Sequence, residues 1–286
     1  MLESFLTTRQ HPKGWTPNRV LWQALRVTTT EAIKLLEKFR AGGVSRDKVL
    51  QAFQAAPAVD LGFAQVDTHR ALRKGFPEVI FGAGKTPEQV LKIASKLLER
   101  EQRILITRVG SDHARGLRKK FKAATHHDLA RCVTIDKQPL PKRSGTIAVV
   151  CAGTSDLPVA EEAAIIAGEM GCRVTRIYDV GVAGLHRLVE PLRNLLSNDV
   201  DAIIVAAGMD GALPSVVAGI VPVPVIGLPT SIGYGFGGNG IAALLSMLQT
   251  CAPGLSVVNI DNGVGAGITA ALIANRVAQA REHQSR

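Results

Sequence analysis

Residues 208–267 read GMDGALPSVVAGIVPVPVIGLPTSIGYGFGGNGIAALLSMLQTCAPGLSVVNIDNGVGAG. Apolar runs of strand length alternate in this stretch with glycine-rich turns. Glycine reaches backbone conformations that are closed to other residues and lets a ligand approach the main chain closely. The alternation predicts strands joined by loops that form a small-molecule site, and we expect that site to be catalytic.

The same pattern extends back to residue 146. Strands are expected at 146–151, 173–178, 202–206, 224–228 and 255–259, each followed by a helix. The strands are apolar on both faces, which is typical of a covered parallel sheet. The sequence therefore predicts a doubly wound α/β domain, in which ligands bind outside the carboxyl ends of the strands. The glycine-rich loops, including 263–267, are expected at those ends.

The part of the chain before residue 146 is expected to form smaller units and is more polar. We expect a basic extension at 1–27, a smaller helical and α/β domain at 28–140, and the α/β catalytic domain at 145–286, with the polar stretch 136–145 as the boundary. Within the second part the pattern predicts helices at 30–40, 45–56 and 86–100 and strands at 78–81, 103–108 and 131–135.

Bulk composition places the chain among soluble globular proteins. Of its 286 residues 46% are hydrophobic and 20% are charged, which is ordinary for that class. No apolar run reaches the ~18 residues of a membrane helix, and the first residues lack the apolar core of a secretory signal. The cysteines, Cys132, Cys151, Cys172 and Cys251, form no CxxC pair. They indicate reduced thiols, and a cytoplasmic enzyme without a membrane partner is expected.

The formal charge of +10 is concentrated in the basic run 115–122, beside His126 and His127. Such a run can indicate nucleic-acid binding. Aromatic residues make up only 4% of the chain, and no nucleic-acid module is recognisable. We expect no nucleic-acid partner, but a solvated helix face or one that attracts a phosphate-bearing metabolite. The two histidines are expected in a surface loop, because no carboxylate or cysteine stands at metal-ligand spacing.

Residues 82–86, GAGKT, are similar to part of a phosphate-binding P-loop. The full motif requires a glycine five positions before Gly84, where this chain has Val79. Pro87 follows directly. The segment is therefore expected to be a strand-to-helix turn with Thr86 as the helix cap.

Three polar residues, Thr154, Ser155 and Asp156, precede the expected helix at 158–170. Asp156 has two possible roles, as a helix cap or as part of a phosphate site built from hydroxyls, glycine amides and the helix end. The other glycine-rich loops at the same sheet edge favour the phosphate site.

Five further positions have both a structural and a functional interpretation. Asp210 is either a turn aspartate that bonds its own backbone or a general base. His186 is either a surface residue or a ligand contact. Asp261 and Asn262 bind ribose hydroxyls or Mg²⁺, or shape a turn. Cys251 is either a buried thiol at a helix end or a nucleophile, which requires a lowered pKa.

Three segments, 153–156, 207–215 and 224–229, resemble motifs of the class I aminoimidazole ribonucleotide carboxylase and mutase family. That family relies on a histidine for proton transfer where this chain has Ala212. Asp210 and Cys251 are additional.

That combination resembles the LarB family of pyridinium-3,5-biscarboxylic acid mononucleotide synthases, which act in nickel-pincer cofactor biosynthesis. The resemblance runs from about residue 28 to 280 and rests on segments 62–67, 75–86, 181–187, 246–254 and 259–262. Two departures are that Asp210 replaces a more usual glutamate and that the loop 236–240 is varied. The implied fold is carboxylase-mutase-like and flavodoxin-like.

The resemblance implies carboxylation of the pyridinium ring of nicotinic acid adenine dinucleotide at carbon 5, with cleavage of the phosphoanhydride to release AMP. Cys251 is then the nucleophile and Asp210 the base, with Asp156 as a further catalytic carboxylate. CO₂ or bicarbonate is the co-substrate, and Mg²⁺ is held mainly by the substrate phosphates.

A homo-oligomer, octamer or tetramer, is expected. The alternatives are a purine-pathway carboxylase or mutase and a non-catalytic nucleotide-binding module. Substrate-binding residues are expected at Gly153, Thr154, Ser155, Gly181, His186, Gly208, Met209, Thr230, Gly233, Tyr234, Gly235, Asn259, Asp261 and Asn262.

Overall fold

The computed structural model describes residues 29–54, 58–60, 65–67, 78–99, 101–139 and 145–284. The chain divides into two compact units, residues 1–69 and 70–286. The expected basic extension at 1–27 lies outside the described residues, as do parts of the motif segments 62–67 and 75–86.

The first unit contains two helices and a two-stranded antiparallel sheet. The helices α1 (Thr29–Arg40) and α2 (Arg46–Gln54) agree with the sequence-based expectation. The hydroxyl of Ser45 accepts a hydrogen bond from the backbone N–H of Lys48 and so caps α2. The strands β1 (Ala58–Asp60) and β2 (Gln65–Asp67) pair with each other and were not predicted.

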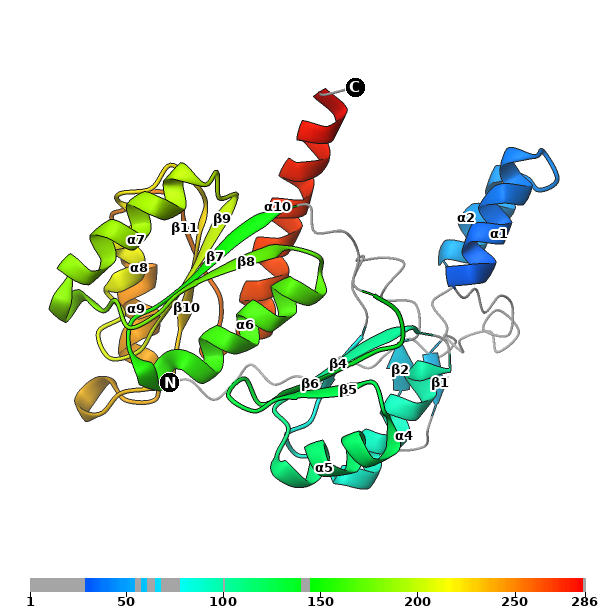
Figure 1. Cartoon of the computed structure of the whole chain (residues 1–286), viewed down its shortest axis with the longest axis horizontal. Helices are drawn as coiled ribbons and strands as arrows, with labels where there is room; N and C mark the ends of the chain where they lie inside the picture. The colour runs from blue at the N-terminus through cyan, green and yellow to red at the C-terminus, as the bar shows by residue number, and fades with distance from the viewer. Residues whose placement is uncertain are drawn as a thin grey trace, which may run out of the picture. The chain divides into compact units, whose positions relative to one another are not determined.

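The second unit begins with a four-stranded mixed sheet (Figure 1). Its strands lie in the order β3–β4–β6–β5, and β3 is parallel to β4 whereas the other pairs are antiparallel. The elements are β3 (Val79–Phe81), α4 (Pro87–Leu98), β4 (Arg103–Thr107), α5 (Ser111–Lys120), β5 (Ala124–His127) and β6 (Cys132–Asp136).

Thr86 caps α4, as the sequence predicted, and forms a capping box with Gln89. Its hydroxyl accepts from the Gln89 N–H, and the Gln89 side chain accepts from the Thr86 N–H. Two orphan donors of the helix start are thereby satisfied. Residues 82–86 are a strand-to-helix turn.

The expectation of a surface loop at His126 and His127 was wrong. Both belong to β5, which pairs with β6. His127 is half-buried, and its Nε2 lies 3.1 Å from the Thr134 hydroxyl. Burial lowers the pKa of His127, and the neighbouring His126 adds to the effect. The strand was missed because it is short and polar and owes its conformation to pairing with β6.

The larger sheet confirms the predicted fold class. Its five strands are β7 (Thr146–Cys151), β8 (Arg173–Ile177), β9 (Ala202–Ala207), β10 (Val225–Pro229) and β11 (Leu255–Val257). They lie in the order β8–β7–β9–β10–β11 and are all parallel. This is the flavodoxin-like doubly wound order. Successive strands are added on one side of β7 and then on the other, so the strand order reverses between β7 and β9.

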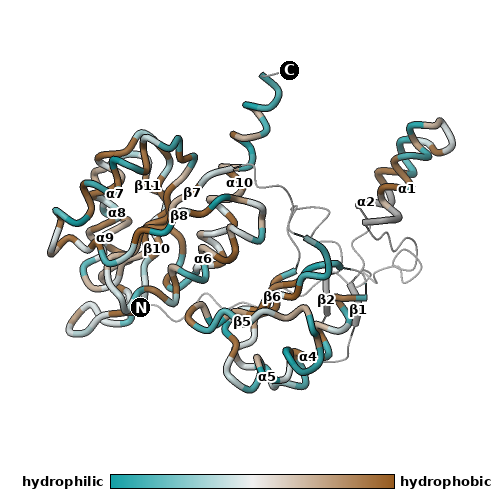
Figure 2. The backbone as a smooth tube through the Cα atoms, viewed as in Figure 1, coloured by the Kyte–Doolittle hydropathy of each residue, from teal (hydrophilic) through white to brown (hydrophobic). Residues whose placement is uncertain are grey.

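Helices cover both faces of this sheet (Figure 1). On one face lie α6 (Leu157–Glu169) and α10 (Gly263–Gln284), and on the other α7 (His186–Ser197), α8 (Leu213–Ala218) and α9 (Ile241–Leu248). Alternate residues of β7 point to the two sides, so Ile147 and Val149 pack on the first and Ala148 and Val150 on the second. The strands form the hydrophobic centre of the domain (Figure 2). Within the described ranges, no helix has the length and apolar character needed to span a bilayer.

Residues 263–267 do not form a loop, contrary to expectation, but the first turns of α10. The reason is close helix packing. A Cβ atom on Gly267 would lie 2.7 Å from the Ala163 carbonyl oxygen and 2.8 Å from the Ile166 Cβ on α6. Glycine therefore serves here to bring two helices together, not to form a turn.

The same substitution at two helical glycines tests this contact. Gly267→Ala should lower the free energy of unfolding by about 1–2 kcal/mol, because overpacking outweighs the gain in helix propensity. Gly168→Ala on α6, where a Cβ would meet nothing within 4 Å, should raise it by up to about 1 kcal/mol. Urea unfolding of both variants measures the difference. Equal effects would show that the contact between α6 and α10 is not tight.

Candidate active site

All of the predicted site residues except Cys251 follow the carboxyl end of a strand in the five-stranded sheet. Because its strands are parallel, these ends form one edge. From β7 to β11 the residues are Gly153, Thr154, Ser155 and Asp156, then Gly181 and His186, then Gly208, Met209 and Asp210, then Thr230, Gly233, Tyr234 and Gly235, and finally Asn259, Asp261 and Asn262.

Asp156 joins three of these loops. Its carboxylate is buried and accepts hydrogen bonds from the Thr230 hydroxyl, from the Gly153 N–H at 3.0 Å and from the Gly208 N–H. Burial raises the pKa of Asp156, while these three donors oppose the rise. A carboxylate that accepts bonds from the loops after β7, β9 and β10 fixes their relative positions.

The loop after β7 presents donors to the edge. Residues Thr154–Asp156 form a short 3₁₀ turn that leads into α6, and Thr154 and Ser155 are exposed. The loop after β8 lies directly against it, since a Cβ on Gly181 would be 2.9 Å from the Ala152 carbonyl oxygen. His186, the first residue of α7, is exposed.

The turn after β9 has an unusual backbone. Met209 has φ +44° and Gly211 has φ +59°. The Met209 N–H donates to the Ile232 carbonyl at 2.8 Å, so closely that a Cβ on Gly208 would overlap that oxygen. Asp210 is exposed, and its Oδ1 accepts from the Ala212 N–H at 3.3 Å. The aspartate thus bonds its own turn and still faces solvent.

The loop after β10 extends away from the sheet. Tyr234 is 81% exposed and Phe236 is fully exposed, whereas Thr230 is fully buried. Glycine occupies the left-handed position at Gly235, φ +75°. Such a concentration of exposed aromatic side chains is typical of a contact surface.

The turn after β11 is tied to the turn after β10. Asp261, at φ +56°, donates its N–H to the Pro229 carbonyl, and its Oδ1 accepts from the Ser231 N–H, each at 2.8 Å. The Asn262 Oδ1 accepts from the Gly265 N–H at 2.8 Å and caps α10. Both residues shape the turn, which is one of the two roles that the sequence suggested for them. Both are also partly exposed at the edge.

Cys251 lies at the opposite edge of the sheet. It stands between α9 and β11, three residues before Gly254, whose carbonyl accepts from the N–H of Val225 at the start of β10. A strand such as β9 is roughly 16 Å long at about 3.3 Å per residue. Within one copy of the chain, Cys251 is therefore not brought together with Asp210.

Sequence reasoning did not find Arg108, which lies at the end of β4 with φ +53°. Its Nε lies 3.3 Å from Oε1 of Glu162 on α6, and its Nη2 donates to the Asp261 carbonyl. Glu162 is buried and also accepts from the Gly263 N–H at the start of α10. Burial raises the pKa of Glu162, and Arg108 is the main opposing influence. Residues so far apart in the chain leave no local signal.

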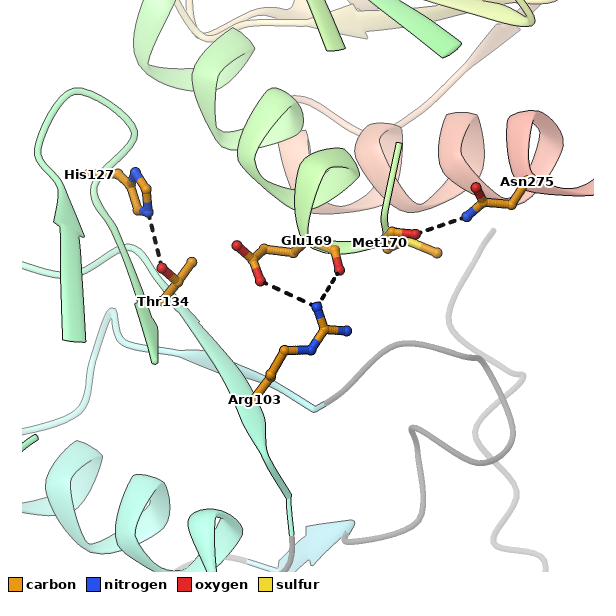
Figure 3. A network of polar contacts seen from close by, with 6 residues as sticks. All are labelled: Arg103, His127, Thr134, Glu169, Met170 and Asn275. Atoms are coloured by element: carbon orange, nitrogen blue, oxygen red, sulfur yellow. Dashed lines mark hydrogen bonds and ion pairs between the residues drawn. The ribbon is translucent and has the colours of Figure 1, made fainter. Parts of the chain in front are cut away.

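Arg103 forms a second link between the mixed sheet and α6 (Figure 3). Its Nη1 donates to the Glu169 carbonyl at 3.1 Å and lies 4.0 Å from the carboxylate of the same residue. Close by, the Asn275 side chain of α10 donates to the Met170 carbonyl at 3.0 Å. The mixed sheet thus contacts α6 through arginines at both ends of β4, Arg103 at Glu169 and Arg108 at Glu162.

The edge offers oxygen ligands suited to Mg²⁺. Asp210 and Asp261 carry carboxylates that keep some exposure, and Mg²⁺ prefers oxygen donors and retains water. Across the residues that the structure describes, no three His, Cys, Asp or Glu side chains gather closely enough to hold a metal alone. Asp210 and Asp261 can each supply an oxygen ligand to such an ion.

Comparison with known proteins finds family models that match two parts of the chain. A family model described as LarB/PurE-like N-terminal domain matches residues 58–138, and one described as AIR carboxylase matches residues 146–286. "Uncharacterized protein MJ0165" of Methanocaldococcus jannaschii is 41% identical over 247 residues, which are 84% of this chain and 95% of that protein.

Two further relatives match part of the chain. An N5-carboxyaminoimidazole ribonucleotide mutase of the same organism is 36% identical over 127 residues, 43% of this chain and 75% of the mutase. The Thermotoga maritima mutase is 34% identical over 134 residues, 44% of this chain and 73% of the mutase.

Removal of Arg108 tests the buried ion pair. Arg108→Ala should lower the free energy of unfolding at pH 7 by about 3 kcal/mol, because it leaves the Glu162 carboxylate buried without its cation. Burial already raises the pKa of Glu162, and loss of the arginine raises it further. Protonation then relieves the variant, so the deficit should shrink as the pH falls towards the ordinary glutamate pKa. Chemical unfolding at pH 5 and pH 7 measures it. A deficit that stays constant with pH would contradict the account.

Proposed function

Since the chain belongs to the carboxylase/mutase-type enzyme family that joins a LarB/PurE-like N-terminal domain to an AIR carboxylase domain, we propose that it carboxylates nicotinic acid adenine dinucleotide. The carboxyl group is added at carbon 5 of the pyridinium ring, and the phosphoanhydride is cleaved to release AMP. The product is pyridinium-3,5-biscarboxylic acid mononucleotide.

The observation that carries the proposal is the contrast among the four thiols. Cys132, Cys151 and Cys172 are buried, and burial raises their pKa values to about 12, 12 and 11. Cys251 alone is exposed. A thiol attacks as the thiolate, so Cys251 is the one cysteine available to a substrate from solvent.

A pyridinium ring is electron-poor and does not attack CO₂. Addition of the Cys251 thiolate at carbon 4 converts it into a dihydropyridine in which carbon 5 is an enamine carbon. Carbon 5 then bonds to CO₂, a base removes the proton from carbon 5, and the carbon–sulfur bond breaks to restore the aromatic ring and the thiolate. The sequence of steps requires one reversible nucleophile and one base.

Asp210 is the base in this proposal. It is exposed at the carboxyl edge, while Asp156 is buried and engaged by three donors. We assign Asp156 the role of holding the loops around the substrate. The exposed hydroxyls of Thr154 and Ser155 and the start of α6 bind a phosphate. When bound, Mg²⁺ supplies charge neutralisation on the diphosphate whose anhydride bond is hydrolysed.

The separation of Cys251 from Asp210 implies that a second copy completes the site. On α9, Ala243 and Met247 are buried, whereas Ile241, Leu245 and Leu248 form an exposed apolar stripe that ends close to Cys251. An apolar stripe of this kind is covered in closed symmetric homo-oligomers. We propose an octamer or tetramer in which one copy contributes Cys251 and its neighbour the carboxyl edge with Asp210.

A purine-pathway carboxylase or mutase is the rival function, and the two mutase relatives support it for residues of the second half. It requires a histidine in place of Ala212. The chain has His186 at this edge instead, exposed at the start of α7. A non-catalytic nucleotide-binding module would have no need of Cys251.

Cys251→Ser should abolish carboxylation and leave the affinity for the dinucleotide within a few-fold, because serine is far less nucleophilic at neutral pH and binding rests on the loops. Product analysis and calorimetric titration measure the two effects. Cys172→Ser, at a buried thiol, is the control and should remain active. Full turnover by Cys251→Ser would remove the cysteine from the mechanism.

Asp210→Asn should allow the thiolate to add to the ring but stall loss of the carbon 5 proton, because an amide does not accept it. Absorbance of the dihydropyridine should then accumulate in single-turnover experiments. An Asp210→Asn enzyme with unimpaired turnover would move the base elsewhere, with Asp156 as the next candidate.

Mixed oligomers test the shared site. Inactive Cys251→Ser and Asp210→Asn chains, co-expressed with different tags, should give about a quarter of the wild-type activity after purification through both tags, as random pairing of copies predicts. Cys251→Ser mixed with the double variant should give none. If the doubly tagged oligomers are as inactive as oligomers of either single variant alone, the two residues do not act across a subunit contact.

A further inference from the structure

A groove of about 530 Å³ lies between the ends of β3 and β4 and the turn before α10. Its wall includes Phe81 at the end of β3, Arg108 at the end of β4, and Ile260, Asp261, Asn262 and Val264 on the other side. Pockets that hold ligands of drug size measure about 300–1,000 Å³. The groove is thus large enough for a nucleoside.

We propose that this groove binds the adenosine half of the substrate, so that the mixed sheet forms a nucleoside subsite for the catalytic domain. The inference rests on the proposed dinucleotide substrate. The two halves of the dinucleotide then bind on either side of Asp261.

Asp261 makes the groove continuous with the carboxyl edge. Asp261 lines the groove, its backbone N–H donates to the Pro229 carbonyl, and its carboxylate accepts from the Ser231 N–H in the loop after β10. A substrate whose phosphates lie at the start of α6 reaches the groove past this residue. Carboxylate and amide side chains of this kind bind ribose hydroxyls, which Asp261 and Asn262 are placed to do.

Phe81 gives the groove an aromatic surface. Although it is a large apolar residue, its side chain is 55% exposed. Ile260 and Val264 add apolar area opposite it. An exposed ring in an apolar wall suits a purine base, because bases stack on aromatic side chains.

The charges of the groove favour the uncharged nucleoside over a phosphate. The Arg108 guanidinium is already engaged by the Glu162 carboxylate and the Asp261 carbonyl. Asp261, which also lines the groove, carries a second carboxylate. The positive charge of Arg108 is therefore already balanced within the groove wall, and the remaining cation beside Phe81 is Lys85, whose Nζ lies 5.9 Å from the centre of the Phe81 ring.

Titration of the intact protein with AMP tests the subsite without any turnover. Phe81→Ala should weaken AMP binding about tenfold or more, as loss of base stacking does. Phe81→Trp should retain it. Leu129→Ala is the matched control, since Leu129 has a similar exposure of 51% and lies in the turn between β5 and β6, outside the groove; it should bind AMP as the wild type does.

Nicotinic acid mononucleotide, which lacks the adenosine half, should bind equally well to the wild type and to Phe81→Ala. AMP binding that is absent from the wild type, or unchanged in Phe81→Ala, would overturn the subsite. Carboxylation is read separately. A wild-type protein that binds AMP through Phe81 but forms no carboxylated product would retain the subsite and refute the proposed function.

Discussion

The parallel direction of the five strands β7 to β11 determines where chemistry can occur in this protein. Every helix must carry the chain back to the opposite edge before the next strand begins, so the loops that follow strands gather at one edge and those that precede strands gather at the other. Asp156, Asp210 and Asp261 lie at the first edge, and Cys251 lies at the second. The proposed site uses both edges and therefore requires two copies of the chain, which we propose to meet on the exposed stripe of α9.

Two buried carboxylates hold the first edge together. Asp156 receives donors from three successive loops, and Glu162 connects α6, the start of α10 and Arg108 of the mixed sheet. Each is stabilised only while its donors remain, since an unpaired buried charge is costly. The contact from Arg108 to Asp261 makes the turn after β11 depend on the mixed sheet as well. Arg108 thus joins the two sheets of the second unit at this edge.

The sequence predicted the parallel sheet and the convergence of its loops because apolar runs and glycine turns are local signals. Strand 146–151 has the predicted bounds, and the other strands of this sheet differ by at most two residues at either end. Strand β5 and the helical start at Gly263 were missed, since one depends on pairing with β6 and the other on packing against α6. The link from Arg108 to Glu162 joins distant parts of the chain, and pattern does not reveal such a pair. The edge on which Cys251 lies does follow from βα alternation, because Cys251 comes before a strand and not after one. A list of reactive residues alone does not show this.

The most direct test of the account is incubation of the purified protein with nicotinic acid adenine dinucleotide, ¹³C-labelled bicarbonate and Mg²⁺, followed by mass spectrometry. The account predicts AMP together with a pyridinium mononucleotide that carries one additional, labelled carboxyl group. Unlabelled nicotinic acid mononucleotide with AMP, which is the outcome of hydrolysis alone, or an unchanged dinucleotide would contradict it.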